Sequence, residues 1–406
     1  APKPAAPSGS QIIHPSAGGG AGKLYTNSIQ QILEFGVVPN ETASQMLRFL
    51  NDFRNLSNPF APDDEARKIR RQATKFYWQI YSMAYLRSIA EPNNVPAPVK
   101  LMTQFGFFDE RLLEPDQIEV LHALSKQNES TEFPIMFHHE FLQKIKSGEE
   151  APSLNEVGLT YEKQLREEQE KSGRRGTEVD ADDPLRKLEY EINNMLQSTV
   201  GVCSGSRSTA FPILNSYQLR GNPEQFFVSK KKIAEVLKDL LNLDYSAFYR
   251  ETVTKMNEPI LIEEEVLPNI ILLPSFGTKS MMWQELVGTN KRSRARIVFP
   301  TFFMGDLKRS MAHSVASFRW ELNRSLQGAM WADPVEGGLT GAYYDYVQFF
   351  RKNSKLSTEA KDKLHERIKA VRNNMRELFC EDYIMWTTYE CEGTMKLNSV
   401  VRDIFY

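Results

Sequence analysis

The stretch DLKRSMAHSVASFRWELNRSLQGAM, residues 306 to 330, carries the clearest structural signal in the chain. Its apolar side chains recur every three or four residues, at Leu307, Met311, Val315, Phe318, Leu322, Leu326 and Met330. That spacing places them on one face of an α-helix. We therefore predict one long amphipathic helix from Asp306 to about Met330, and with it a fold in which helices pack on one another.

Further helices are predicted on the C-terminal side of this stretch. A short one spans Tyr343 to Arg351, and Ser357 can cap the next, because its hydroxyl accepts a free amide of the first turn. The inner face of that next helix is expected to carry Leu364, Ile368, Val371, Met375 and Leu378. More helix follows from Glu381, so the last hundred residues are expected to be helical.

The pattern changes on the N-terminal side of residue 306. Ile260 to Ile262 and Ile270 to Leu273 are compact apolar runs around a Leu-Pro-Asn break, and Arg296 to Phe299 is a third such run. Their length and punctuation favour short strands. We predict a small β element of two or three strands near residues 260–300, in which the first two runs could form a hairpin.

Helical patterns return in the first third of the chain. Asn40 and the pair Asp63 and Asp64 are suited to helix starts, and Pro92 ends the helix that begins at Asp63 near Ala90. Shorter helices are expected between residues 99 and 145, and Ser229 can cap another that carries Ile233. The fold class predicted for the whole chain is mainly α, with multi-helix packed domains and the small β element described above.

Two polar segments divide the chain. Residues 1–23 are rich in Pro, Ala, Gly and Ser, and residues 149–184 hold charge clusters and few apolar side chains. Neither segment can bury enough apolar surface to offset its ordering entropy. We predict a flexible linker at 1–23, an N-terminal helical domain at 24–148, a charged linker at 149–184 and a mainly helical C-terminal domain at 185–406. Another domain or a processed leader is expected to precede the first linker.

Composition limits the classes of function. The chain has 406 residues, of which 41% are hydrophobic and 25% charged, and its net charge is −2. That charge balance favours neither nucleic acid nor an anionic membrane, and no apolar run is long enough to span a bilayer. The three cysteines are far apart and odd in number, so we expect a reducing compartment, the cytoplasm, with the periplasm as the alternative.

Two groups of residues are candidate sites. Lys291, Arg292, Arg294 and Arg296 form a cationic run that could bind phosphate or nucleic acid, although a solvated turn paired with nearby acids is favoured. The second group lies on the long helix and could line a pocket in a domain cleft. Its members are His313, Arg319, Trp320, Glu321 and Arg324. An interhelical network of ion pairs is the favoured interpretation, since Arg pairs readily with carboxylates between helices.

Other motifs fail a chemical requirement. Residues 18–23 lack the first Gly and the Ser/Thr of a phosphate loop, and Glu119 with His122 has no second copy for a di-iron site. His138 and His139 are adjacent, so their side chains diverge and cannot easily share a metal ion. Cys203 has no assignable base. We therefore expect no catalytic residues, no metal and no cofactor.

The C-terminal half resembles an uncharacterised α-rich region of bacterial proteins from spirochaetes and clostridia. The resemblance rests on four stretches, at residues 318–322, 327–331, 346–352 and 371–379, and covers residues 24–406. In those proteins the region tends to follow a cyclic nucleotide-binding domain. No activity is established for it, so no site residues carry over. This chain shows no nucleotide-binding β-roll, so the resemblance implies a sensor domain upstream of residue 1.

Three functions are compatible with these patterns. The favoured one is a non-enzymatic helical interaction and regulatory module that binds a protein partner or a second copy of itself, tethered to the upstream domain. The first alternative is an enzyme of unfamiliar class with a cleft near residues 291–324. The second is phosphate or nucleic-acid binding through the Arg run at 291–296, which would show a steep dependence on salt.

Overall fold

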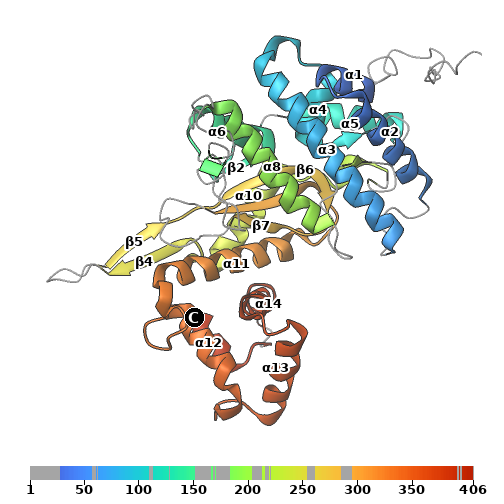
Figure 1. The fold of residues 1–406 in the computed structure, drawn as a ribbon. Coiled ribbons are helices and arrows are strands. Elements are labelled where there is room, and N and C mark those ends of the chain that lie inside the picture. Colours follow the sequence, from blue (N-terminus) through green and yellow to red (C-terminus); the bar gives the residue numbers. More distant parts are fainter. Residues whose placement is uncertain are drawn as a thin grey trace, which may run out of the picture.

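The protein is described here by a computed structural model that covers most of the chain outside the polar segments. The described residues are 28–56, 61, 63–108, 113–127, 129–150, 166–167, 170, 183–203, 213–214, 219, 221–253, 261–284, 295–390, 393 and 396–405. The predicted linker at 1–23 and most of the predicted linker at 149–184 lie outside them. Within these ranges the fold is mainly α with a small β element, as the sequence predicts (Figure 1).

Helices build the first part of the chain. They are α1 (Ser28–Phe35), α2 (Asn40–Asn55), α3 (Asp64–Ala90), the 3-10 turn η1 (Pro92–Asn94), α4 (Ala97–Phe105), α5 (Pro115–Ser125) and α6 (His138–Ser147). The predicted start and end of α3 are confirmed: the Asp63 carboxylate accepts a hydrogen bond from the Ala66 amide at 2.8 Å, and Pro92 follows the last turn. Two more helices follow, α8 (Pro184–Cys203) and α10 (Lys230–Leu243), with the turn η2 (Pro223–Gln225) between them.

A four-stranded sheet lies at the centre of the molecule, in the strand order β2-β6-β8-β7. Its strands are β2 (Ile135–Phe137), β6 (Asn269–Gly277), β7 (Met281–Gln284) and β8 (Arg296–Phe303). β6 pairs in parallel with β2 and β8, whereas β7 is antiparallel to β8. All residues of the two central strands, β6 and β8, are buried, which requires that both faces of the sheet be covered.

The sheet separates two apolar cores. Because side chains alternate across a strand, Ile270 and Leu272 of β6 enter one core and Ile271 and Leu273 enter the other. Helices α1 to α4, α6 and α8 build the core on one side of the sheet, and α5, α10 and the C-terminal helices build the core on the other side. Figure 1 shows α1 to α3, in blue, and the C-terminal helices, orange to red, on opposite sides of the strands.

Two small sheets complete the β structure. β1 (Phe107–Phe108) pairs in parallel with β3 (Ile213–Leu214), and β4 (Tyr249–Val253) pairs antiparallel with β5 (Leu261–Glu265). The predicted hairpin between the first two apolar runs is therefore wrong: the first run belongs to β5 and the second to β6, and they join different sheets. The reason is burial, because the second run is apolar on both faces and fits only a central strand.

The C-terminal helices are α11 (Leu307–Gln327), α12 (Gly338–Phe349), α13 (Thr358–Ala370), α14 (Met375–Thr388) and α15 (Ser399–Phe405), with the turns η3 (Gly328–Met330) and η4 (Phe350–Lys352). The long helix predicted from the opening stretch is α11. The single helix predicted from Ser357 through Leu378 is wrong, because Arg372 and Asn373 adopt positive φ and break it. Asn374 then caps α14 by accepting the Glu377 amide at 3.2 Å.

The division into domains at 24–148 and 185–406 remains a prediction, and the sheet draws on both parts. β2 comes from the first part and pairs with β6 from the second, while α8 packs against α3 and α6. None of the helices in the described ranges combines the length and the apolarity that a membrane crossing requires.

Candidate functional site

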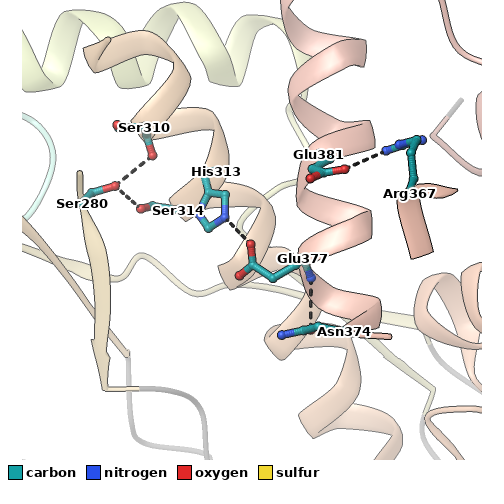
Figure 2. Close-up of polar contacts among 8 residues, drawn as sticks. All are labelled: Ser280, Ser310, His313, Ser314, Arg367, Asn374, Glu377 and Glu381. Carbon is teal, nitrogen blue, oxygen red and sulfur yellow. Dashed lines mark hydrogen bonds and ion pairs between the residues drawn. The ribbon is translucent and has the colours of Figure 1, made fainter. Parts of the chain in front are cut away.

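The polar residues predicted on the long helix lie where α11 packs against α14. Figure 2 shows this contact around His313, whose Nε2 lies 3.0 Å from Glu377 Oε2. Behind them, Ser280 Oγ donates to the Ser310 carbonyl at 3.0 Å and lies 2.6 Å from Ser314 Oγ. The His313 ring is paired with a carboxylate of the facing helix, an arrangement that joins two helices.

The electrostatics of this pair follow from its position at the protein surface. The hydrogen bond from His313 holds the pKa of Glu377 below its ordinary value, although partial burial opposes that shift. The two side chains are 38% and 40% exposed, so solvent screens their attraction. The pair is expected to stabilise the contact between α11 and α14 only modestly.

We expect Glu377→Gln to lower the free energy of unfolding by less than about 1 kcal/mol at neutral pH. A carboxylate with a lowered native pKa stabilises the fold above its unfolded pKa, near the ordinary 4.5, and that stabilisation disappears as the pH falls through the native pKa. Urea unfolding of both proteins between pH 7 and pH 3 would measure this. A difference that is undiminished at pH 3 would contradict the assignment.

Arg319 is engaged elsewhere. Its Nη1 donates to Asp244 Oδ2 at 2.9 Å, and the Tyr383 hydroxyl donates to the same oxygen at 2.7 Å. The second oxygen of Asp244 accepts the Ser246 hydroxyl at 2.9 Å, and Asp244 itself is buried. Asp244 follows α10, whereas Arg319 lies on α11 and Tyr383 on α14. One buried carboxylate thus connects three elements that are far apart in the sequence.

Glu321 and Trp320 serve packing in a similar way. The buried Glu321 accepts Arg324 Nε at 3.0 Å on one oxygen and Arg376 Nη1 at 3.2 Å on the other. Trp320 is buried, and the centroid of its ring lies 6.2, 6.0 and 5.2 Å from those of Trp331, Tyr343 and Phe379. The contacts of both side chains therefore lie within the C-terminal helices and stabilise their packing.

A further buried ion pair, which the sequence did not single out, lies nearby. Arg367 Nη1 contacts Asp382 Oδ1 at 2.7 Å, and the Tyr343 hydroxyl donates to Asp382 Oδ2 at 2.6 Å. Burial raises the pKa of Asp382, while the charge of Arg367 opposes that rise. Arg367 also reaches Glu381 at 3.3 Å, as Figure 2 shows. Nothing in the local sequence spacing pairs Arg367 with Asp382, because they lie on different helices.

The five predicted pocket residues therefore do not converge on one point. His313, Arg319 and Glu321 have separate partners, and Trp320 is enclosed by aromatic rings. Their arrangement is a set of ion pairs and hydrogen bonds between helices, which was the favoured interpretation of the sequence. A nucleophile and a base need direct contact, and this surface of α11 offers none within the described residues.

The predicted cationic run is only partly described. Lys291, Arg292 and Arg294 lie outside the described residues. Arg296 is buried at the start of β8, where its Nη1 donates to Glu191 Oε1 of α8 at 3.2 Å. Its guanidinium also lies 4.6 Å from the centre of the Phe141 ring. Burial lowers the pKa of Arg296, and the Glu191 charge opposes that shift. Arg296 thus connects the sheet to α8 and α6.

A pocket lies on the other side of the sheet, between the end of α3, η1, α4 and α6. Its volume is about 620 Å³, and its lining includes Tyr85, Val99, Thr103 and His139. The divergence predicted for the two adjacent histidines occurs here. His138 is fully buried beside Tyr81, at 3.1 Å from its hydroxyl, whereas His139 lines the pocket. Sequence spacing alone could not find this pocket, because its walls come from three helices.

Burial also governs the ionisation of these two rings. It lowers the pKa of His138 to about 3, with a smaller contribution from His139. It lowers the pKa of His139 as well, an effect that Lys230 reinforces and Glu140 opposes. Both rings are neutral at physiological pH as a result. Within the described part of the chain, no group of three or more His, Cys, Asp or Glu side chains could hold a metal ion.

Part of the chain matches a known family model. Residues 328–406 match a domain of unknown function (DUF8509), a segment that runs from η3 to the end of the chain and contains α12 to α15. No curated protein and no solved structure matches the chain. The match includes α12 and α14, which pack against α11, and its description states no activity.

Proposed function

We propose that this protein is a non-enzymatic interaction module that docks a protein partner and thereby serves a regulatory role. The observation that carries the proposal is an exposed apolar turn that a buried carboxylate holds in place. Leu243, Tyr245 and Tyr249 expose 43%, 84% and 44% of their surface, and they lie within the seven residues from the last residue of α10 to the first residue of β4. We call these three side chains the apolar turn.

The apolar turn is anchored from beneath. Between its exposed residues, Asp244 and Phe248 point inward: Asp244 binds Arg319 and Tyr383, and Phe248 packs edge-on against Phe318 at 5.4 Å. The exposed side chains are therefore presented by a fixed backbone, which reduces the entropy lost on binding. Exposed tyrosines on a rigid support are typical anchors of protein interfaces. Arg319, predicted to line a pocket, positions this surface instead.

The adjoining hairpin indicates the chemistry of the partner. β4 and β5 extend away from the body of the protein, as Figure 1 shows, and Glu263, Glu264 and Glu265 of β5 are exposed. Arg250 pairs with Glu264, and within the described residues Glu263 and Glu265 have no such partner. A basic protein surface would complement these exposed carboxylates, whereas the phosphates of a nucleic acid would be repelled by them.

The regulatory part of the proposal rests on the resemblance to regions that follow a cyclic nucleotide-binding domain. In this account a cyclic nucleotide sensor changes state, and the helical module transmits the change by binding or releasing its partner. The match to a domain of unknown function is compatible with this account and adds no activity to it.

Photo-cross-linking in cells of the source organism tests the proposed surface. With p-benzoylphenylalanine in place of Tyr245, we expect one dominant protein adduct, which mass spectrometry would identify, and Tyr249→Ser should weaken its formation. The control carries p-benzoylphenylalanine in place of Val37, because Val37 is an exposed apolar residue between α1 and α2. An adduct with the mass of two chains would identify self-association. No adduct at 245, or equal adducts at both positions, would overturn the proposal.

A further inference from the structure

We propose that the pocket between α3, α4 and α6 binds a small molecule with an apolar body and one anionic group. The pocket lies on the opposite side of the sheet from the apolar turn, so this inference is independent of the proposed docking surface. Its volume of about 620 Å³ is within the range of natural small-molecule sites.

One wall of the pocket is apolar, and other parts of its lining are polar. Ile89, Pro92, Val95 and Val99 supply an apolar wall from the end of α3, η1 and the start of α4. Val99 is fully buried, so the wall continues the apolar core. An apolar body in the pocket would gain roughly 25 cal/mol for each Å² of apolar surface that it removes from water.

Two lysines from different helices supply the positive charge. Lys100 of α4 and Lys146 of α6 both line the pocket. Within the described ranges neither amine has an ion pair or a hydrogen bond. Two acids near Lys146 are engaged elsewhere: Glu140 pairs with Lys230 at 2.8 Å and Glu149 with Lys144 at 3.7 Å. Two cations at one concave site focus a positive field that attracts an anion.

The remaining polar groups of the lining favour one orientation of the ligand. The Tyr85 hydroxyl donates to the His139 carbonyl at 3.0 Å, and the Thr103 hydroxyl donates to the Lys100 carbonyl at 2.9 Å. Both hydroxyls keep lone pairs that can accept a donor from the ligand. His139 Nδ1 is buried and has no hydrogen-bond partner among the described residues. The anionic group is thus expected at the two amines, and any donor of the ligand at this deeper wall.

A pair of fluorescent probes tests the proposal on the full chain. Anilinonaphthalene sulfonate combines an aromatic body with one anionic group, and phenylnaphthylamine has the same body without the charge. We expect both to bind at one saturable site. Lys100→Gln with Lys146→Gln should weaken binding of the sulfonate by about tenfold and leave phenylnaphthylamine unchanged. Lys68→Gln with Lys75→Gln removes two exposed lysines of α3 away from the pocket and should change neither affinity.

Three further measurements complete the test. Ser88→Trp places a bulky ring in the pocket and should abolish saturable binding of both probes, with unchanged circular dichroism as evidence of folding. Octanoate and octyl phosphate should displace the sulfonate, and whichever is stronger identifies a carboxylate or a phosphate as the preferred group. Inorganic phosphate alone should not displace it. Equal loss of both probes in the double lysine variant, no change in sulfonate affinity, or unchanged binding to a folded Ser88→Trp protein would overturn the proposal.

Discussion

Replacing Asp244 with alanine is expected to lower the free energy of unfolding of the C-terminal helices by about 3–5 kcal/mol. The carboxylate is buried, and its Oδ2 is shared by Arg319 at 2.9 Å and Tyr383 at 2.7 Å. Its removal leaves a mostly buried guanidinium and a buried hydroxyl without their acceptor, and both were desolvated when the protein folded. The loss should appear in urea unfolding followed by tryptophan fluorescence, since Trp386 lies 6.0 Å from the Arg319 guanidinium.

Two controls separate this effect from a general sensitivity to lost charge. Asp403→Ala removes an exposed ion pair with Lys355 at 3.4 Å and should cost less than about 1 kcal/mol. In a background that carries Arg319→Leu and Tyr383→Phe, the Asp244→Ala change should cost far less than in the native protein, because no donor is left unpaired. An equal cost in both backgrounds would show that Asp244 does not stabilise these helices through its two donors.

Acidification is expected to destabilise the protein through His138. In the folded state burial lowers the pKa of this ring to about 3, whereas in the unfolded chain it is near 6.5. Below pH 6.5 the unfolded state therefore binds a proton that the native state does not, and stability falls as the pH falls toward 3. The contribution of this one ring approaches about 1.4 kcal/mol for each pH unit, or roughly 3 kcal/mol at pH 4.5.

The measurement is the dependence of the unfolding free energy on pH between 7 and 4.5, compared with that of His138→Gln. In this range the slope for the variant should correspond to up to one fewer proton bound on unfolding than the slope for the native protein. Tyr81→Phe is the matched control: it removes the hydroxyl 3.1 Å from the ring but retains the titrating group, so stability should drop while the slope persists. A His138→Gln protein with the native slope would place the acid sensitivity elsewhere.

Several features of the fold were predictable because they depend on local sequence. The period of the apolar residues places α11 correctly, and the caps at Asp63 and Ser229 mark the starts of α3 and α10. The break between α13 and α14 was missed, because the apolar period continues through Val371 and Met375 while Arg372 and Asn373 leave the helical conformation. A helical period shows which residues share a face, and it does not exclude a turn between them.

The pairing of the strands was harder to predict from the sequence than the positions of the helices. The apolar runs at 270–273 and 296–299 are confirmed as strands, but their partners are not sequence neighbours. β6 pairs with β2, which is more than a hundred residues away, and β5 turns back on β4. The pairing is decided by which strand can be buried on both faces, and that depends on the helices that cover the sheet.

The amino-acid sequence by itself determined the mainly helical class, the position of α11 and the residue types available for ion pairing, because these follow from periodicity and composition. Tertiary structure alone decided what those residues do. It gave Arg319 and Tyr383 the same acceptor in Asp244, buried Arg296 against Glu191, and brought Lys100 and Lys146 to one pocket. Such contacts join elements far apart in the chain, and no local spacing encodes them.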